Sequence, residues 1–292
     1  MHPSPSVIIF TTLSGLGFGL LIFLGLGEPV VTAWTAFWFF VIAYALSVGG
    51  LLSSTLHLGH PERALKAFTQ WQTSWLSREA WAAVAALLVM GLYAFLAVFF
   101  GLRVAALGWL GAALSLATVV ATAMIYTQLR TVPRWNHMLT PLHMVATSLA
   151  GGALLAGQIT PASVLLLAAG MIQVGHWSVG DTRFAEAGHT LASATGLGGR
   201  GTVRAFEPPH TGTNYLLTEM VHVIGRKHAL KLRAIALALG YALPLGLILV
   251  PGAGHLLGGL AVVSHLIGIF VSRWLFFAEA EHVVGLYYGK RR

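Results

Sequence analysis

The sequence predicts an all-α protein that crosses a membrane eight times. Of its 292 residues, 57% are hydrophobic and 9% are charged. A soluble domain carries about 25% charged residues, so this chain has too few to cover a surface that faces water. Cysteine is absent, which excludes disulfides, thiolate zinc sites and cysteine-bound iron–sulfur clusters within the chain. We expect a single integral membrane domain over residues 1–292.

Eight apolar segments are long enough to cross the hydrocarbon core of a bilayer. The first has no basic segment before it, so we interpret it as a helix of the mature protein rather than a signal peptide. Its glycines Gly15, Gly17 and Gly19 predict close packing against other helices, because no strand precedes them as a nucleotide loop would require. The predicted spans are about 7–27, 33–56, 80–100, 104–128, 139–157, 160–179, 233–251 and 253–278.

Basic residues are distributed unequally between the two ends of these spans. With eight spans, both termini lie on one side, together with the connections between spans 2 and 3, 4 and 5, and 6 and 7. That side holds every Lys and Arg except Arg103 and Arg273. Short loops rich in basic residues stay in the cytoplasm. We therefore expect a multi-pass protein of the bacterial inner membrane with both termini cytoplasmic, and the net charge of +8 requires no nucleic acid partner.

The connection over residues 180–232 is polar, rich in glycine and long for a loop. Loops of this length are usually functional or disordered. Its second half, EPPHTGTNYLLTEM, contains Pro-Pro, and Thr213 or Asn214 can cap a helix that starts near Tyr215. We predict that this cytoplasmic insert docks a partner subunit, although its basic residues can instead anchor it at lipid headgroups. The residues that would share one face of the helix are Leu216, Met220 and Val223.

Residues 56–81, LHLGHPERALKAFTQWQTSWLSREAW, concentrate polar side chains at the cytoplasmic end of the second span. His57 lies at the helix end, Gly59 lets the backbone leave the helix, and Pro61 starts a new one. A turn can bring Arg63 back toward the pocket of His57. Arginine and tryptophan at such an interface also have an ordinary role as anchors. The tryptophans that could form this aromatic belt are Trp71, Trp75 and Trp81.

The same residues suit the headgroup of a quinone. A quinone is an apolar ring with two carbonyls, and its reduction takes up two electrons and two protons. Histidine carries protons at neutral pH. Arginine stays charged and stabilises negative charge on the headgroup. We therefore expect His57 and Arg63 to take part in catalysis, with Trp71 as a further contact to the quinone.

The segment HLGHPERA resembles the HLG-x-P-x-R-A signature of the dimethyl sulfoxide reductase membrane-anchor family. The resemblance extends to WLSREA, to YTQLRTVPRWNHMLTP and to the number of spans, and it covers nearly the whole chain except the insert. It implies an eight-helix subunit that holds a quinone site and no cytochrome. It also implies that His57, Gly59 and Arg63 belong to the quinone-site motif. Tyr126 and Arg273 occupy further positions that match this family.

The resemblance implies two soluble partners, a molybdopterin catalytic subunit and a ferredoxin-like subunit with iron–sulfur clusters. Some members of the family oxidise a quinol, as in dimethyl sulfoxide reduction, whereas a cytoplasmic branch oxidises sulfite and reduces a quinone. The segment EPPHTGTNYLL resembles the second branch. The predicted orientation favours the same branch. The motif and the insert face the cytoplasm, whereas reductases of this family commonly work outside it. We expect electrons to pass from sulfite to ubiquinone or menaquinone, with sulfoxide reduction as the alternative.

A subunit that binds haem b is a second alternative, because the chain has 13 histidines. His143, His176 and His265 lie in or near spans, but an axial pair needs two histidines at one depth on facing helices. Intramembrane histidine can instead form a hydrogen bond with a neighbouring helix, so we do not favour haem. A transporter is disfavoured because it would need broken helices in matching halves, and Pro244 has no clear counterpart.

Acidic side chains near the span ends have two possible roles. They can carry protons between the quinone and water, or they can pair with nearby arginines, which we favour for Glu281. The other residues of this kind are Glu79, at the start of the third span, and Glu279, at the end of the last.

Overall fold

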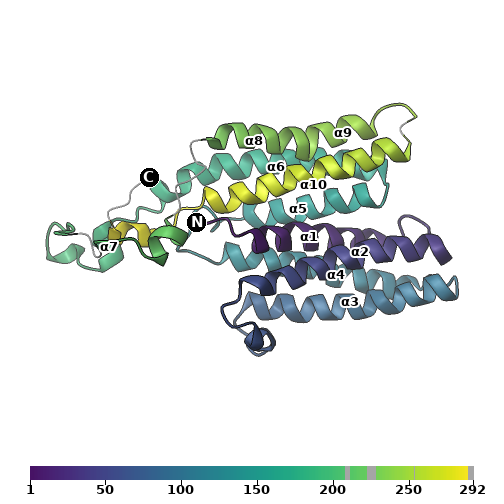
Figure 1. The fold of residues 1–292 in the computed structure, drawn as a ribbon, viewed down its shortest axis with the longest axis horizontal. Coiled ribbons are helices and arrows are strands. Elements are labelled where there is room, and N and C mark those ends of the chain that lie inside the picture. Colours follow the sequence, from purple (N-terminus) through teal and green to yellow (C-terminus); the bar gives the residue numbers. More distant parts are fainter. Residues whose placement is uncertain (208–210, 222–227, 253, 289–292) are drawn as a thin grey trace.

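The computed structural model is a bundle of helices (Figure 1) and describes residues 1–292 except 208–210, 222–227, 253 and 289–292. The side chains of His57 and Pro61 also lie outside the described part. No strand occurs in the part that is described. The α-helices are α1 (Pro5–Leu26), α2 (Ala33–Ser53), α3 (Trp75–Phe99), α4 (Ala105–Thr127), α5 (Leu139–Leu155), α6 (Ile159–Glu186), α7 (Leu191–Thr195), α8 (Ala229–Leu237), α9 (Leu243–Ile248) and α10 (His255–Ala278).

Seven helical segments of the described chain are long and apolar enough to cross a membrane. They are α1, α2 with its extension to Leu56, α3, α4, α6, the continuous segment Ala229–Ile248, and α10. The all-α membrane fold predicted from the sequence is therefore confirmed. The remaining predicted span corresponds to α5, which is apolar but has only 17 residues. It packs against α6, α1, α4 and α10 as a member of the bundle. Because α5 is shorter than the seven long helices, the count of eight spans stays a prediction.

Helix α1 lies at the centre of the bundle, between a group formed by α2, α3 and α4 and a group formed by α5, α6, α8 and α10 (Figure 1). A central helix must be apolar on all sides and narrow enough for close neighbours. A Cβ atom on Gly17 would overlap the backbone of Ser47 in α2, and one on Gly19 would overlap the backbone of Ser148 in α5. The prediction that these glycines serve close helix packing is confirmed.

The segment that contains Pro244 is a continuous helix with a bulge rather than a break. Proline has no backbone N–H, so Pro244 cannot donate to the carbonyl of Gly240, and the turn Ala238–Ala242 before it is π-helical. His265 Nδ1 lies 2.6 Å from the Gly240 carbonyl oxygen, and Ser264 Oγ donates to the Leu239 carbonyl at 2.8 Å. The predicted hydrogen bond from an intramembrane histidine to a neighbouring helix is thus confirmed for His265.

Several helix boundaries differ from the predicted ones, because polar residues extend the helices beyond the apolar runs. Helix α3 begins at Trp75 rather than near 80, and α6 continues to Glu186 rather than ending near 179. Helix α2 ends at Ser53 and continues as a 3-10 turn over Ser54–His57. A second 3-10 helix covers Pro61–Phe68, so the predicted restart at Pro61 is confirmed. Hydropathy misses such extensions because ion pairs and loop contacts satisfy the polar residues.

The long connection between α6 and α8 lies at the same end of the bundle as the N-terminus, the segment Val283–Tyr288 and the loop between α2 and α3 (Figure 1). Asn214 Oδ1 accepts a hydrogen bond from the N–H of Leu217 at 3.0 Å, as predicted, but the helix it caps is a π-helical turn over Leu216–Met220. Asn214 also donates to the Tyr288 hydroxyl at 3.2 Å. Pro208, Pro209 and Val223, which figured in the prediction, lie outside the described residues.

Candidate functional site

The loop that carries the HLGHPERA segment is held in place by the first turns of α3. Ser77 Oγ accepts a hydrogen bond from the N–H of Gln70 at 3.2 Å, and Trp81 Nε1 donates to the Phe68 carbonyl at 3.0 Å. The Arg78 guanidinium donates to two further carbonyls of the loop, at 3.0 and 2.6 Å. Three side chains of the WLSREAW segment therefore bind the loop.

The predicted site residues on this loop lie at the surface of the bundle end. The Arg63 side chain is 60% exposed, and its Nε lies 3.9 Å from the carboxylate of Glu62. Trp71 is 58% exposed, and a Cβ atom added to Gly59 would meet no neighbour. The side chain of His57 is outside the described part. The loop thus presents an accessible arginine and tryptophan, and its contact with a quinone stays a prediction.

A buried polar centre lies directly below this loop. Glu79, between the loop-binding residues Arg78 and Trp81, points into the bundle and is 3% exposed. Thr122 of α4 donates a hydrogen bond to its carboxylate. Thr122 also lines a small cavity with Arg273 and with polar residues of α1 and α5. The cavity volume of about 10 Å³ is close to the space that one water molecule needs.

Arg273 of α10 is the cationic member of this centre and is 2% exposed. Among the described residues, its Nε and Nη1 have no hydrogen-bond partner. Tyr126 lies one turn after Thr122 on α4, within electrostatic range of both Glu79 and Arg273. Its ring packs edge-on against Trp135, Phe276 and Phe277. The structure therefore brings the predicted residues Tyr126 and Arg273 together, and it places Glu79 beside them.

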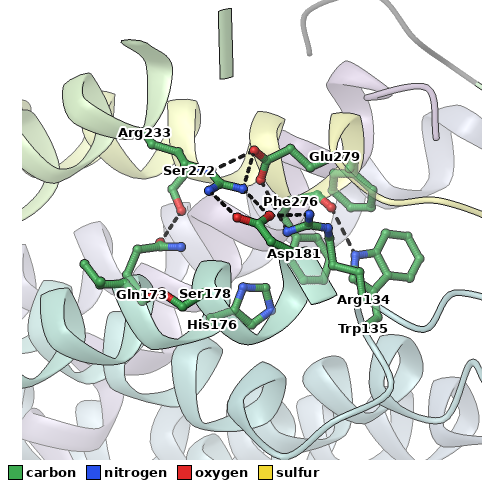
Figure 2. Close-up of polar contacts among 12 residues, drawn as sticks. Arg134, Trp135, Gln173, His176, Ser178, Asp181, Arg233, Ser272, Phe276 and Glu279 are labelled. Atoms are coloured by element: carbon green, nitrogen blue, oxygen red, sulfur yellow. Dashed lines mark hydrogen bonds and ion pairs between the residues drawn. The ribbon is translucent and has the colours of Figure 1, made fainter. Parts of the chain in front are cut away.

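Four charged side chains from four segments form a second polar cluster nearby (Figure 2). Asp181 of α6 accepts from Arg134 at 2.6 Å and from Arg233 of α8 at 2.7 and 2.8 Å. Glu279, directly after α10, lies 2.8 Å from Arg233 Nε and 3.7 Å from Arg134 Nη1. Burial raises the pKa of Glu279, although both arginines oppose that shift. Gly180 makes room for the cluster, because a Cβ there would come within 2.8 Å of Arg134.

The histidines considered as haem ligands do not form an axial pair in the described structure. The rings of His143 and His176 are stacked, with centroids 5.4 Å apart and an interplanar angle of 29°. Two axial ligands direct their nitrogens at one iron from opposite sides, whereas these rings lie face to face. His265 Nδ1 is engaged by the Gly240 carbonyl, and a Cβ on Gly151 would come within 2.9 Å of its Nε2.

Residues 1–174 match the model of one protein family, described as DMSO reductase anchor subunit (DmsC). The chain belongs to the DmsC family. It is also 32% identical, over 330 aligned positions that cover 99% of both chains, to a protein of Allochromatium vinosum named as a sulfite dehydrogenase subunit. The matched part contains the HLGHPERA loop, Glu79 and Tyr126. The resemblance inferred from the motif is therefore confirmed, and the chain is a membrane anchor subunit.

In this DmsC family member, two groups of functional candidates are not evident from the sequence. Thr122 gives no signal, because one threonine in an apolar helix is ordinary. Asp181 falls within the predicted loop insert, yet it lies four residues after Trp177, which places it on the same side of α6 as this buried residue. Glu279, considered above as a proton carrier or ion-pair partner, is paired with two arginines in the described structure.

Proposed function

We propose that this chain is the quinone-reactive anchor of a molybdopterin and iron–sulfur complex that oxidises sulfite in the cytoplasm. The observation that carries the proposal is the similarity over 99% of the chain to the sulfite dehydrogenase subunit of Allochromatium vinosum, which includes the insert between α6 and α8. The partners are a molybdopterin catalytic subunit and an iron–sulfur subunit. Since the chain contains no cysteine, cysteine-bound clusters belong to the partners.

The described side chains provide a donor set that fits a quinone. A bound quinone accepts two electrons and two protons at its carbonyl oxygens. Arg273 has two buried N–H groups without partners, and buried donors of this kind are rare unless a ligand or water uses them. The loop above offers Arg63 and Trp71 at the surface, where an isoprenoid ligand can enter from the lipid. We assign the headgroup to the surface where this loop meets the start of α3, with Glu79, Arg273 and Tyr126 behind it.

In this arrangement each residue has a distinct task. His57 is the acid–base group at the surface side of the headgroup, and Gly59 leaves room for it. Arg63 supplies a fixed positive charge and Trp71 an apolar contact face. Because the cavity beside Arg273 holds about one water, Arg273 acts on the headgroup through water. The hydrogen bond from Thr122 holds the Glu79 carboxylate close to the same cavity.

The enzymatic role predicts sulfite-dependent reduction of a quinone by membranes that contain the complete complex. We expect reduction of a short-chain ubiquinone or menaquinone analogue on addition of sulfite. Deleting this chain should abolish that rate, whereas transfer from sulfite to ferricyanide, which needs only the soluble subunits, should continue. If sulfite gives no quinone reduction while a quinol drives dimethyl sulfoxide reduction, the alternative direction is correct.

The proposed orientation places the α2–α3 loop, the insert and both ends of the described chain in the cytoplasm, where the partners would dock. The absence of cysteine allows single-cysteine labelling. A Cβ on Gly199 in the insert meets no neighbour, and Leu102 at the opposite end of the bundle is 54% exposed. In intact spheroplasts, we expect an impermeant maleimide to label Leu102→Cys and to reach Gly199→Cys only after lysis. The reverse pattern would place the partners outside the cytoplasm.

A further inference from the structure

Three histidines from three segments form a continuous stack beside the buried centre. His137 precedes α5, His143 lies in its second turn, and His176 lies on α6 between them. The ring centroids of His137 and His176 are 5.1 Å apart, and those of His143 and His176 are 5.4 Å apart. His143 and His176 are 1% and 2% exposed. The stack therefore extends from the connection between α4 and α5 into the interior of the bundle.

Most ring nitrogens of the stack lack hydrogen bonds within the described chain. Both nitrogens of His137 and of His143 have no partner of good geometry, and neither does Nδ1 of His176. His176 Nε2 lies 3.3 Å from the Thr140 hydroxyl, Gln173 is a polar neighbour of His143, and the Arg134 backbone is a polar neighbour of His137. Buried polar atoms without partners are costly, so water molecules or exchangeable protons are expected at these nitrogens. His265, by comparison, has Nδ1 engaged by the Gly240 carbonyl and only Nε2 without a partner among the described residues.

The outer end of the stack lies near an ion pair that reaches water. His137 and His176 lie within electrostatic range of Arg134, which binds Asp181 at 2.6 Å. The Asp181 side chain is 43% exposed, so it contacts bulk water. Figure 2 shows His176 below this ion cluster, on the side of Gln173. Because an arginine does not release its proton, the entrance of the path is the water that reaches this ion pair next to the stack.

The inner end of the stack reaches the proposed quinone site. Arg273 lies within electrostatic range of both His143 and His176. It lines the water-sized cavity together with Thr122 and with Met144, the residue after His143. Thr122 in turn binds Glu79. The polar residues therefore continue from the exposed Asp181 to the cavity behind the headgroup.

We propose that His137, His176 and His143 form a proton-uptake path from the cytoplasmic water at Asp181 to the buried centre at Arg273. The proposal rests on the quinone reduction proposed above. In that reaction the quinone receives two electrons from the partner clusters and two protons, and one O–H bond forms on each carbonyl oxygen. An imidazole suits such a path because it accepts a proton on one nitrogen and releases one from the other. Since the rings lie face to face, water at the ring edges carries the proton from one ring to the next. The stack delivers a proton to the carbonyl oxygen that faces the interior, and His57 delivers a proton to the other carbonyl oxygen.

The test compares His143→Gln with His265→Gln in the intact complex. Glutamine keeps a polar side chain of similar size but cannot relay a proton. We expect His143→Gln to lower the sulfite–quinone rate by about 10-fold or more, with the sulfite–ferricyanide rate unchanged, because ferricyanide accepts electrons without protons. Added imidazole should restore part of the lost rate, which a structural defect would not allow. His265→Gln should keep the quinone rate of the wild type.

A quinone rate in His143→Gln equal to that of the wild type would overturn the path but leave the proposed function intact. A wild-type complex that fails to reduce quinone would instead overturn the proposed function. If His143→Gln does not assemble, the sulfite–quinone rate of His176→Gln tests the path in its place. A second test uses the wild-type complex in vesicles. In vesicles with the partner subunits outside and a pH dye inside, quinone reduction should leave the inner pH constant. Alkalinisation of the interior would show uptake from the opposite side and overturn the path.

Discussion

Replacing Gly19 by alanine is expected to destabilise the bundle by about 3 kcal/mol or more, the upper end for an overpacked core. The added methyl group would overlap the backbone carbonyl of Ser148, and backbone atoms cannot turn away as a side chain can. A Cβ on Gly152 of α5 would in turn overlap the backbone of Gly19 at the same helix crossing. Because α1 packs on α2, α4 and α5, a shift at this point disturbs the whole bundle. Thermal unfolding in detergent should show a midpoint lower by roughly 5–10 °C.

Gly49→Ala in α2 is the matched control, since a Cβ there meets no neighbour within 4 Å. Alanine also favours a helix over glycine, so its midpoint should stay the same or rise slightly. Size-exclusion chromatography of extracted protein should give a monodisperse peak for this variant and a reduced one for Gly19→Ala. Equal behaviour of the two variants would mean that α1 and α5 approach less closely than the structure describes.

The close approach of α1 was predictable because glycine spacing in an apolar helix carries a direct physical meaning. The helical class and the cap at Asn214 followed in the same way from local chemistry. The predicted start of α3 and end of α6 were wrong because hydropathy treats polar residues as a cost. In the structure Arg78 binds the loop just before α3, and Glu79 and Asp181 find partners in distant segments. The number of spans depends on α5, whose 17 residues fall below the usual length of a span.

The site residues also differ in whether local sequence or only the packed bundle identifies them. The family motif identified the loop and pointed to Tyr126 and Arg273, which the structure brings close to one another. The ion cluster joins residues 134, 181, 233 and 279, and no spacing rule connects positions so far apart. The depth of His143 and His176 could be estimated from their helices, but their stacking depends on how α5 and α6 are rotated. Such relations exist only in the packed bundle.

Replacing His57 by alanine is expected to lower quinone-linked turnover by about 10-fold or more while the complex stays assembled. The expectation rests on the proposed role of His57 as the acid–base group at the surface side of the headgroup. Electron delivery by the partners does not involve this side chain, so sulfite–ferricyanide activity should be unchanged. Arg63→Lys should also reduce the quinone rate, because a lysine ammonium does not reproduce the planar guanidinium.

His60→Ala is the control that separates a site residue from a loop residue, because it removes the other histidine of the same HLGH segment. His60 Nδ1 lies 2.9 Å from Glu62 at the surface, with a side chain 65% exposed, and an exposed pair of this kind contributes little. Its loss should leave the quinone rate within about twofold of the wild type, since surface changes cost about 0.5 kcal/mol or less. If His60→Ala lowers the rate as much as His57→Ala, the loop acts through its conformation. If neither variant lowers it, the headgroup binds elsewhere, and Arg273 with Glu79 becomes the part of the site to test next.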